Sequence, residues 1–346
     1  MSILVTGGAG YIGSHMVYGL LDRGEQVAVL DNLSTGLRDL VPAGARFFHG
    51  DVSDKNLVRW ILADREVDDV IHFAGSAVVP DSVKDPIAYY RNNTAASLDL
   101  LDACITGGVK HFIFSSTAAV YGTCHGCCID ESNPPAPINP YGRSKLMTEW
   151  MLQDAARASE MRFMVLRYFN VAGADPDGRT GQSTPRATHL IKRACQVALG
   201  LAGHLDIYGC DFPTPDGTGV RDYIHVADLV EAHRLALAAL RSGASSATMN
   251  CGYGRGFSVR QVVETIEQAT GRPLPTRLQA RRPGDPAAVV ADSSRLRKEL
   301  GWRPRHDTLD EIVCHALEWE ARAGVVPNIA RMRTSFNSAQ TVRDCV

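Results

Sequence analysis

A tyrosine and a lysine are spaced so that one face of a helix could present both to a substrate. Tyr141 and Lys145 are four residues apart and follow Pro140, a residue type common at the first position of a helix. A tyrosine has a pKa of about 10 and is a weak base at neutral pH, but a nearby ammonium group or a positively charged nicotinamide favours the phenolate. The spacing therefore suits a proton-abstracting tyrosine, although this pattern also arises often by chance.

Hydroxyl side chains stand upstream of this pair. Ser115, Ser116 and Thr117 directly follow the apolar run 112–114, and Thr117 precedes Tyr141 by 24 residues. In open α/β sheets, ligands bind outside the carboxyl ends of the strands, where these hydroxyls would lie. Their position favours a catalytic site over a chance pairing of tyrosine and lysine.

A glycine-rich turn follows the first apolar run of the chain. Gly7, Gly10 and Gly13 are spaced by three residues, after the run 3–5 and before a helical pattern. Such glycines permit a tight turn, a close approach of the backbone to a pyrophosphate and close packing of helix on strand. The helix that follows would offer its unpaired N–H groups to the phosphates.

Acidic residues follow the next two runs. Asp31 stands 18 residues after Gly13, where a carboxylate accepts hydrogen bonds from a ribose hydroxyl and repels a 2′-phosphate, so NAD is favoured over NADP. The alternative is a turn residue or helix cap before Asn32. Asp51 and Val52 are placed to meet an adenine ring, but turn chemistry explains them equally well.

The order of the apolar runs predicts the fold. Short runs alternate with helical patterns at residues 3–5, 26–30, 46–48, 70–73, 112–114 and 163–166. Such runs are typical of strands buried on both faces in a parallel sheet. The sequence therefore predicts an α/β fold with a Rossmann-type doubly wound parallel sheet and a smaller α+β substrate-binding lobe.

A change of composition after Asn170 marks a predicted domain border. The stretch 171–185 is rich in Gly, Asp, Pro and Thr, and a helical pattern follows it. We expect a dinucleotide-binding domain with the catalytic residues over 1–170 and a substrate-binding lobe over 171–330. The polar, aperiodic segment 331–346 is expected to be a mobile tail.

The composition excludes several classes of partner. The formal net charge of −2 gives no attraction to nucleic acid or an anionic membrane, and no apolar run approaches the roughly 20 residues that span a bilayer. Because the first predicted strand begins at once, we expect no targeting segment and a cytoplasmic protein whose nine cysteines stay reduced. The segment 124–128 (CHGCC) looks like half of a zinc site, but no second pair of ligands stands at a suitable spacing, so no metal is expected.

Several stretches together resemble a known family. The glycine turn and the Ser/Thr–Tyr–Lys pattern resemble the extended short-chain dehydrogenase/reductase family, and most closely its UDP-glucose 4-epimerases. The resemblance runs from residue 1 to about residue 320. The stretches that carry it are 6–15 (TGGAGYIGSH), 72–75 (HFAG), 167–170 (RYFN), 216–226 (DGTGVRDYIHV) and 281–285 (RRPGD).

The resemblance implies an activity. It is the NAD-dependent interconversion of UDP-galactose and UDP-glucose, by removal and return of a hydride at C4 through a 4-keto intermediate. Tyr141 would be the catalytic base, Lys145 would bind the nicotinamide ribose and tune Tyr141, and Thr117 would hold the sugar 4-hydroxyl. The family resemblance also implies a homodimer formed through paired helices.

The resemblance assigns two sets of binding residues. The expected cofactor residues are Gly7, Gly10, Tyr11, Ile12, Gly13, Asp31, Asn32, Asp51, Val52, Phe73, Ala74, Gly75, Asn92, Ser115, Tyr141, Lys145 and Tyr168. The expected UDP-sugar residues are Thr117, Tyr141, Asn170, His189, Leu190, Ile207, Tyr208, Arg221, Arg282, Asp285 and Val289. Guanidinium groups at 221 and 282 suit a diphosphate, although ordinary surface salt bridges are the alternative.

The chain departs from the family at the predicted rim of the pocket. Family members often have a lysine within the segment 76–78 (SAV here), and others have Gly-Glu-Ser at 80–82 (PDS here). At Val289, some relatives carry a bulky aromatic that crowds the sugar 2-substituent, whereas valine leaves room for an N-acetyl group. Simple packing of Val289 within a strand is the alternative.

Three rival functions remain open. The first is another NAD-dependent epimerase, acting on a UDP-N-acetylhexosamine or a UDP-pentose. The second is a nucleotide-sugar decarboxylase or dehydratase; dehydratases carry Asp-Glu after the strand threonine, where this chain has Ala118 and Ala119. The third, from a different class, is a non-catalytic NAD-sensing regulator on the same fold, which would not need both Tyr141 and Lys145.

Overall fold

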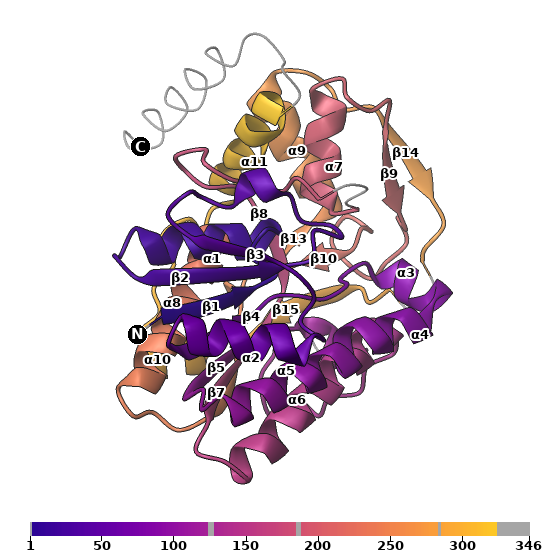
Figure 1. The fold of residues 1–346 in the computed structure, drawn as a ribbon. Helices are drawn as coiled ribbons and strands as arrows, with labels where there is room; N and C mark the ends of the chain where they lie inside the picture. The colour runs from indigo at the N-terminus through magenta and orange to yellow at the C-terminus, as the bar shows by residue number, and fades with distance from the viewer. Residues whose placement is uncertain (1, 124–127, 185–187, 283–284, 324–346) are drawn as a thin grey trace.

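Seven parallel strands form the central sheet of the computed structural model, which describes residues 2–123, 128–184, 188–282 and 285–323 (Figure 1). Their order across the sheet is β12-β7-β5-β4-β1-β2-β3, and every neighbouring pair is parallel. The predicted doubly wound α/β fold is confirmed. The strands are β1 (Ser2–Thr6), β2 (Gln26–Asp31), β3 (Arg46–His49), β4 (Val67–His72), β5 (His111–Thr117), β7 (Arg162–Tyr168) and β12 (Ala247–Cys251).

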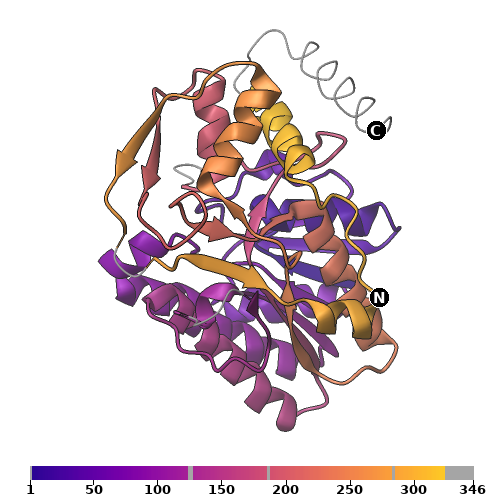
Figure 2. The same ribbon diagram turned by 180° about the vertical axis from the view of Figure 1, so that it is seen from behind.

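Helices cover both faces of this sheet, which explains why its central strands are apolar runs. Every residue of β1 and of β5 is buried. On one face lie α1 (Tyr11–Leu21) and α8 (Val226–Arg241), which contact each other. Figure 2 shows α10 (Ser294–Leu300), which packs on α8 and β12. The other face carries α2 (Lys55–Asp64), α5 (Ala96–Thr106) and α6 (Pro140–Arg157).

A second lobe lies beside the carboxyl ends of the central strands (Figure 1). Three of its helices contact one another: α7 (Leu190–Ala198), α9 (Val259–Thr270) and α11 (Leu309–Ala323). A four-stranded sheet has the order β13 (Phe257–Ser258), β10 (Val220–Arg221), β15 (Ala288–Ala291) and β6 (Cys128–Ile129). The remaining strands form two pairs, β8 (Asn170–Ala172) with β11 (Tyr223–His225) and β9 (Leu205–Tyr208) with β14 (Thr276–Gln279).

The chain passes between the two lobes more than once. The expected border at residue 170 does not separate them, because α8 and β12 come later in the chain and complete the large sheet. Pairing of β12 with β7 is a long-range contact that local composition does not encode. Residues 331–346, the expected tail, lie outside the described part of the chain. Among the described residues, no helix combines the length and apolar character needed to cross a bilayer.

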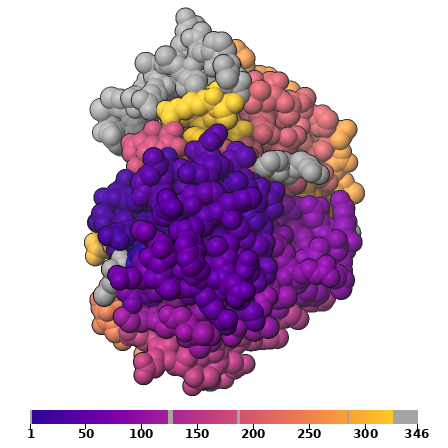
Figure 3. Space-filling view, in the orientation of Figure 1, coloured from indigo at the N-terminus to yellow at the C-terminus, as the bar shows by residue number. Residues whose placement is uncertain are grey.

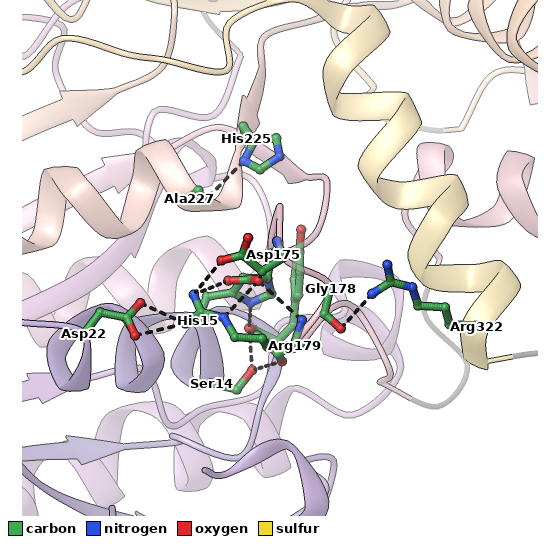
Figure 4. Close-up of polar contacts among 12 residues, drawn as sticks. Ser14, His15, Asp22, Asp175, Gly178, Arg179, His225, Ala227 and Arg322 are labelled. Atoms are coloured by element: carbon green, nitrogen blue, oxygen red, sulfur yellow. Dashed lines mark hydrogen bonds and ion pairs between the residues drawn. The ribbon is translucent and has the colours of Figure 1, made fainter. Parts of the chain in front are cut away.

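The loop after β8 fastens the second lobe to α1 (Figure 4). Arg179 donates to Asp22 of α1 at 2.9 Å and to Asp175 within the loop at 2.7 Å. The hydroxyls of Ser14 and Thr180 are 2.7 Å apart. At the far end of α11, Arg322 donates to the Gly178 carbonyl at 3.1 Å. The surfaces of the two lobes meet in the space-filling view, so this loop belongs to a continuous contact between them (Figure 3).

Three short helices precede α5 along the rim of the site. They are α3 (Val79–Lys84), α4 (Pro86–Tyr89) and a π-helical segment, Tyr90–Ala95, that runs directly into α5. Two 3₁₀ turns, Arg38–Leu40 and Ala118–Val120, follow β2 and β5. A π-helical turn inside a longer helix is often found at a functional site.

Candidate active site

The carboxyl ends of the central strands converge on one edge of the sheet. Gly7 follows β1, Asp31 ends β2, Phe73 follows β4, Thr117 ends β5 and Tyr168 ends β7. Because these strands are parallel, all five positions lie at the same edge. The residues that the sequence assigned to the cofactor and to catalysis therefore share one side of the molecule.

The glycines of the first turn leave space that any side chain would fill. Gly7 has a φ of +70°, and a Cβ there would lie 2.5 Å from the backbone nitrogen of Ala74. A Cβ on Gly13 would lie 2.1 Å from the Gly7 carbonyl oxygen. Gly10 precedes α1 without a side-chain cap, so the first N–H groups of the helix are left for a ligand. This cradle fits the pyrophosphate of a dinucleotide.

Asp31 holds the turns that follow β1 and β2. It is buried, and its carboxylate accepts backbone N–H groups from Ala9 at 2.9 Å and from Leu33 at 2.8 Å. Each carboxylate oxygen has a further lone pair, so both can still accept a ribose hydroxyl. Asn32 donates to Asp51 at 2.7 Å, which joins the ends of β2 and β3.

The catalytic candidates meet where β5 faces the start of α6. Asn139 caps α6 by accepting the Gly142 N–H at 2.9 Å, and Pro140 occupies the first turn. This start places Tyr141 and Lys145 on successive turns, and both side chains are buried. Lys145 Nζ donates to the Ser115 carbonyl at 3.1 Å, and the hydroxyl of Thr117 hydrogen bonds to that of Tyr141.

Burial changes the acid–base properties of both side chains. It raises the pKa of Tyr141 above its usual value, and the hydrogen bond from Thr117 acts in the opposite direction. It lowers the pKa of Lys145 to about 8, although the negative charge of Glu149 favours the ammonium form. The expected lowering of the Tyr141 pKa by Lys145 is therefore not present here, because burial dominates and the ammonium bonds to the Ser115 carbonyl. A positively charged nicotinamide near Tyr141 is the remaining source of that lowering.

Apart from Thr117 and Tyr141, the candidate UDP-sugar residues belong to the second lobe. Asn170 begins β8, His189 and Leu190 stand at the start of α7, and Ile207 and Tyr208 end β9. Three others lie on or next to β10 and β15: Arg221, Asp285 and Val289. Arg282 follows β14.

Two of these candidates already have partners in the structure. The Arg221 guanidinium donates to the Asp285 carboxylate at 2.6 Å, and the Arg282 guanidinium lies 3.9 Å from the centre of the Tyr208 ring. Both arginines are thus held close to other candidate residues. The salt bridge of Arg221 agrees in part with the alternative interpretation, in which this arginine forms an ordinary ion pair and does not bind a diphosphate.

A small cavity joins one subset of the candidates. It has a volume of about 30 Å³ and is lined by Asn170, His189, Leu190 and Tyr223, with Trp319 of α11 on its far side. Ile207, Tyr208 and Arg282 do not line this cavity. The structure therefore brings the β8 and α7 candidates together, and keeps the β9 and β14 candidates as a separate group.

Sequence reasoning named Asn92 and missed its neighbour Asn93. Asn93 is buried, its Oδ1 accepts the Ser76 N–H at 2.7 Å, and its Nδ2 donates to Ser144 on α6 at 3.0 Å. Asn92 instead donates to the Ser76 hydroxyl at 2.9 Å. Asn93 thus ties the segment after Gly75 to the catalytic helix. The two consecutive asparagines in the sequence suggest that one of them is buried. The π-helical turn determines that this residue is Asn93.

His233 of α8 contacts a predicted cofactor residue, Ser115. Its Nε2 is 2.7 Å from the Ser115 hydroxyl, and its Nδ1 bonds to the Leu229 carbonyl at 2.9 Å. Burial lowers the pKa of His233 to about 4, so the ring is neutral at pH 7. It therefore acts as a neutral support for the end of β5. His225 is also structural, since its Nδ1 caps α8 by accepting the Ala227 N–H at 3.0 Å (Figure 4).

A possible cation-binding group lies in the described part of α11 and in the segment before it. His306, Glu311 and His315 each offer one ligand atom within 4.8 Å of the others. His306 and Glu311 already pair with each other at 2.6 Å. Residues 124–127 of the cysteine-rich segment lie outside the described residues, and Cys128 is exposed in β6.

The fold and the site define a class of enzyme. A glycine cradle follows the first strand of the doubly wound sheet, and a helix with the Tyr–Lys pair faces the fifth strand. This is the arrangement of the nicotinamide-dependent short-chain dehydrogenases/reductases. The chain belongs to the NAD dependent epimerase/dehydratase family, whose sequence profile it matches over residues 3–252.

Comparison with known proteins narrows this class to one group. The UDP-glucose 4-epimerase of Azospirillum brasilense is 57% identical over 318 residues, covering 92% of this chain and 91% of the relative. The crystal structure of the Brucella ovis UDP-glucose 4-epimerase in complex with NAD is 44% identical, with a TM-score of 0.89 and coverage of 92% and 97%. The UDP-Glc/GlcNAc 4-epimerase of Campylobacter jejuni is 43% identical, with a TM-score of 0.82 and coverage of 93% and 99%.

Proposed function

We propose that this protein interconverts UDP-galactose and UDP-glucose, with NAD as its cofactor. The observation that carries the proposal is the placement of Thr117, Tyr141 and Lys145 beside the glycine cradle, at the edge of the sheet that faces the second lobe. Bound NAD would supply a reversible hydride acceptor for C4 of the sugar, which permits inversion at C4 through a 4-keto intermediate. The enzyme is thus an isomerase with no net redox change.

Each side chain of the site has a separate role in this reaction. Tyr141 takes the proton from the sugar 4-hydroxyl, and Thr117 orients that hydroxyl and donates to the phenol oxygen. Lys145 holds the ribose next to the nicotinamide. Arg221 and Arg282 anchor the diphosphate, because guanidinium groups pair bidentately with phosphate oxygens, while the sugar turns over in the pocket.

The residues that would hold NAD surround the cradle. The segment from Gly7 to Gly13, which leads into α1, would hold the pyrophosphate. Asp31 accepts the adenosine ribose hydroxyls, and its charge disfavours the 2′-phosphate of NADP. The other residues proposed here for the cofactor are Asn32, Asp51, Val52, Phe73, Ala74, Gly75, Asn92, Ser115 and Tyr168.

The sequence after the catalytic threonine argues against the dehydratase alternative. Elimination of water needs an added acid–base pair beside the 4-keto sugar. Ala118 and Ala119 form a 3₁₀ turn directly after Thr117 and have no titratable group. A non-catalytic NAD sensor, the other rival, would not need Tyr141 and Lys145 buried together.

The test of this proposal is turnover of UDP-galactose by the purified protein. Because the hydride is returned, we expect NAD to co-purify with the protein and no NADH to accumulate during turnover. Formation of one NADH for each UDP-galactose consumed would contradict the epimerase mechanism, and binding of NAD without any turnover would favour a sensor.

A second substrate, UDP-N-acetylgalactosamine, is favoured by the position of Val289. This residue pairs with Arg221 across β15 and β10 and packs beside Val120 and Tyr121, next to the turn after Thr117. A valine there leaves more room than an aromatic ring would. The C. jejuni relative, whose name includes UDP-GlcNAc, makes this activity a reasonable extension of the proposal.

We also propose a homodimer formed through α5 and α6. Leu98 and Ile105 on α5, and Trp150 on α6, are large apolar side chains with exposed fractions of 54%, 40% and 53%. The two helices contact each other and lie side by side in Figure 1. Exposed apolar side chains gathered on neighbouring helices are typical of an isologous interface.

A cytoplasmic location remains a proposal. It is supported by the buried cysteines Cys104, Cys195 and Cys251, which are free thiols. Thiols in this state are typical of a reducing compartment.

A further inference from the structure

A buried carboxylate lies one helical turn beyond the catalytic lysine. Glu149 follows Tyr141 and Lys145 at intervals of four residues along α6, so the three side chains share one face of the helix. Its side chain is fully buried. It accepts the Ser116 hydroxyl and two bonds from the Arg167 guanidinium, at 3.1 Å to Oε1 from Nε and 2.6 Å to Oε2 from Nη2.

Three consecutive residues of β5 each hold one turn of this helix. The carbonyl of Ser115 accepts the Lys145 ammonium, the hydroxyl of Ser116 donates to Glu149, and the hydroxyl of Thr117 bonds to Tyr141. Arg167 lies opposite Ser116 in the register of β5 and β7. The strand end and the catalytic helix are therefore aligned through one set of polar contacts.

The ion pair is not explained by stability alone. Desolvation of two charges is costly, and apolar side chains of similar volume often replace a buried pair without loss of stability. In this chain the pair also determines a local balance of charge, because Lys145 and Arg167 are both buried cations. Without the carboxylate, Arg167 would lose its ion-pair partner, and Lys145 would lose the negative charge that favours its ammonium form.

We propose that Glu149, paired with Arg167, is a positioning residue for the active site, which keeps Lys145 in its ammonium form and fixes the strand end that carries Thr117. This inference rests on the epimerase reaction proposed above. Glu149 contacts neither the sugar nor the nicotinamide in this proposal, and it acts through Lys145 and Ser116.

Several titratable groups lie near Lys145. Of these and Lys145 itself, Lys145 is the one whose charge changes just above neutral pH. Burial lowers the pKa of Lys145 to about 8, that of His72 on β4 to about 3 and that of His233 on α8 to about 4. Burial raises the pKa values of Tyr141 on α6 and Tyr168 on β7, and the Arg167 guanidinium stays charged. As pH rises through about 8, the ammonium is therefore lost and activity should fall.

Two substitutions should lower this alkaline limit. Glu149→Gln keeps the shape of the side chain and removes its charge, so Lys145 loses its proton more easily and the limit moves down by about one pH unit. Arg167→Gln leaves Glu149 buried without its ion-pair partner, which favours the neutral carboxyl, so the limit should move down as well. Glu149→Asp keeps the charge and should leave the limit in place, even if a displaced Ser116 lowers the maximal kcat.

Asp69→Asn is the matched control. Asp69 is also fully buried and pairs with Arg241 at 2.7 Å, but it lies at the start of β4, far along the strand from the carboxyl edge. This variant should lose thermal stability and keep the wild-type pH limit, because its ion pair does not face Lys145.

The experiment is the pH dependence of kcat for UDP-galactose from pH 6 to 9.5, together with the pH dependence of NAD affinity measured without a sugar. We expect the same result in both measurements: limits below the wild type for Glu149→Gln and Arg167→Gln, and an unchanged limit for Asp69→Asn. At pH 8.5, kcat of Glu149→Gln should be about tenfold lower relative to the wild type, with KM within about twofold.

Identical limits for Glu149→Gln and the wild type, or a shift in Glu149→Asp as large as in Glu149→Gln, would overturn the inference. If Glu149→Gln does not fold, the downward shift of Arg167→Gln and the unchanged limit of Glu149→Asp decide the question. A wild type without epimerase activity would contradict the proposed function, while the NAD measurements would still test the charge on Lys145.

Discussion

At Tyr141 two effects act on the same phenol. Burial raises its pKa, and the hydrogen bond from Thr117 lowers it. The residue must lose its proton to act as a base, so binding of a positively charged nicotinamide nearby would favour the reactive form at the moment it is needed. Cofactor binding and base activation are thereby coupled at a single side chain.

Substitution of Tyr141 by phenylalanine tests this assignment. Tyr141→Phe keeps the ring and removes the proton acceptor, so kcat should fall by roughly 10² to 10⁴, with UDP binding nearly unchanged. Steady-state kinetics with UDP-galactose and calorimetry with UDP measure the two effects. The control is Tyr18→Phe on α1, which should keep full activity. A Tyr141→Phe enzyme that kept most of its activity would assign the base to another residue.

The size of the side chain at Val289 is proposed to determine which UDP-sugars the enzyme accepts. Val289→Tyr should reduce kcat/KM for UDP-N-acetylgalactosamine by about tenfold or more and leave UDP-galactose turnover largely intact, because the ring occupies space beside the 2-substituent. Val289→Ala, at the same position, should keep both activities. Equal effects of tyrosine on the two sugars would show that Val289 only packs within β15.

At the scale of elements, the site depends on how β1, β4 and α1 approach one another. The turn after β1 passes so close to the segment after β4 that no side chain fits at Gly7. The same turn releases the N-terminus of α1 toward the cofactor. Geometry at this junction thus sets both the packing of the sheet and the binding of NAD.

The Gly7→Ala variant measures the importance of this contact. The added methyl group would lie 2.5 Å from the Ala74 backbone nitrogen, and neither backbone can move freely, so we expect a loss of roughly 3 kcal/mol or more of folding stability and loss of bound NAD. Gly24→Ala is a matched control with a φ of +76° and no atom within 4 Å of the new methyl group. It should cost only about 1 kcal/mol and keep NAD. Thermal unfolding and the absorbance of released cofactor give both values, and equal losses in the two variants would contradict the steric explanation.

At the scale of the whole molecule, two lobes and a proposed pair of subunits hold the site together. The loop after β8 joins α1 of the cofactor domain to the second lobe through Arg179 and Thr180. The proposed interface on α5 and α6 would stabilise the helix that carries Tyr141 from its outer side.

Substitution of Trp150 tests the proposed dimer. Trp150→Glu places a charge in the centre of the apolar surface, so light scattering after size-exclusion chromatography should give the mass of one chain rather than two. Trp60→Glu on α2 is the control; this tryptophan is 52% exposed and packs on Phe48 of β3, the strand at one edge of the sheet, so it should leave the dimer intact. Dissociation by both variants, or by neither, would exclude α5 and α6 as the specific interface.

Sequence alone determined those features of this protein that depend on local pattern. The spacing of Gly7, Gly10 and Gly13, the apolar runs of the central sheet and the four-residue interval between Tyr141 and Lys145 each follow from residues close together in the chain. A tight turn, a strand buried on both faces and a shared helix face are local consequences of residue type, so they could be read without coordinates.

Only the tertiary structure decided which distant residues meet. The seventh strand, β12, could not be assigned to the large sheet from its own composition, because pairing with β7 joins segments about 80 residues apart. For the same reason, the sequence does not show that Glu149 and Arg167 are buried and paired. As charged residues they would be expected on the surface, and only the packing of α6 on β7 brings them together. Burial of Tyr141 reversed the expected direction of its pKa for the same reason, since desolvation depends on every segment that covers a side chain and not on its neighbours in the sequence.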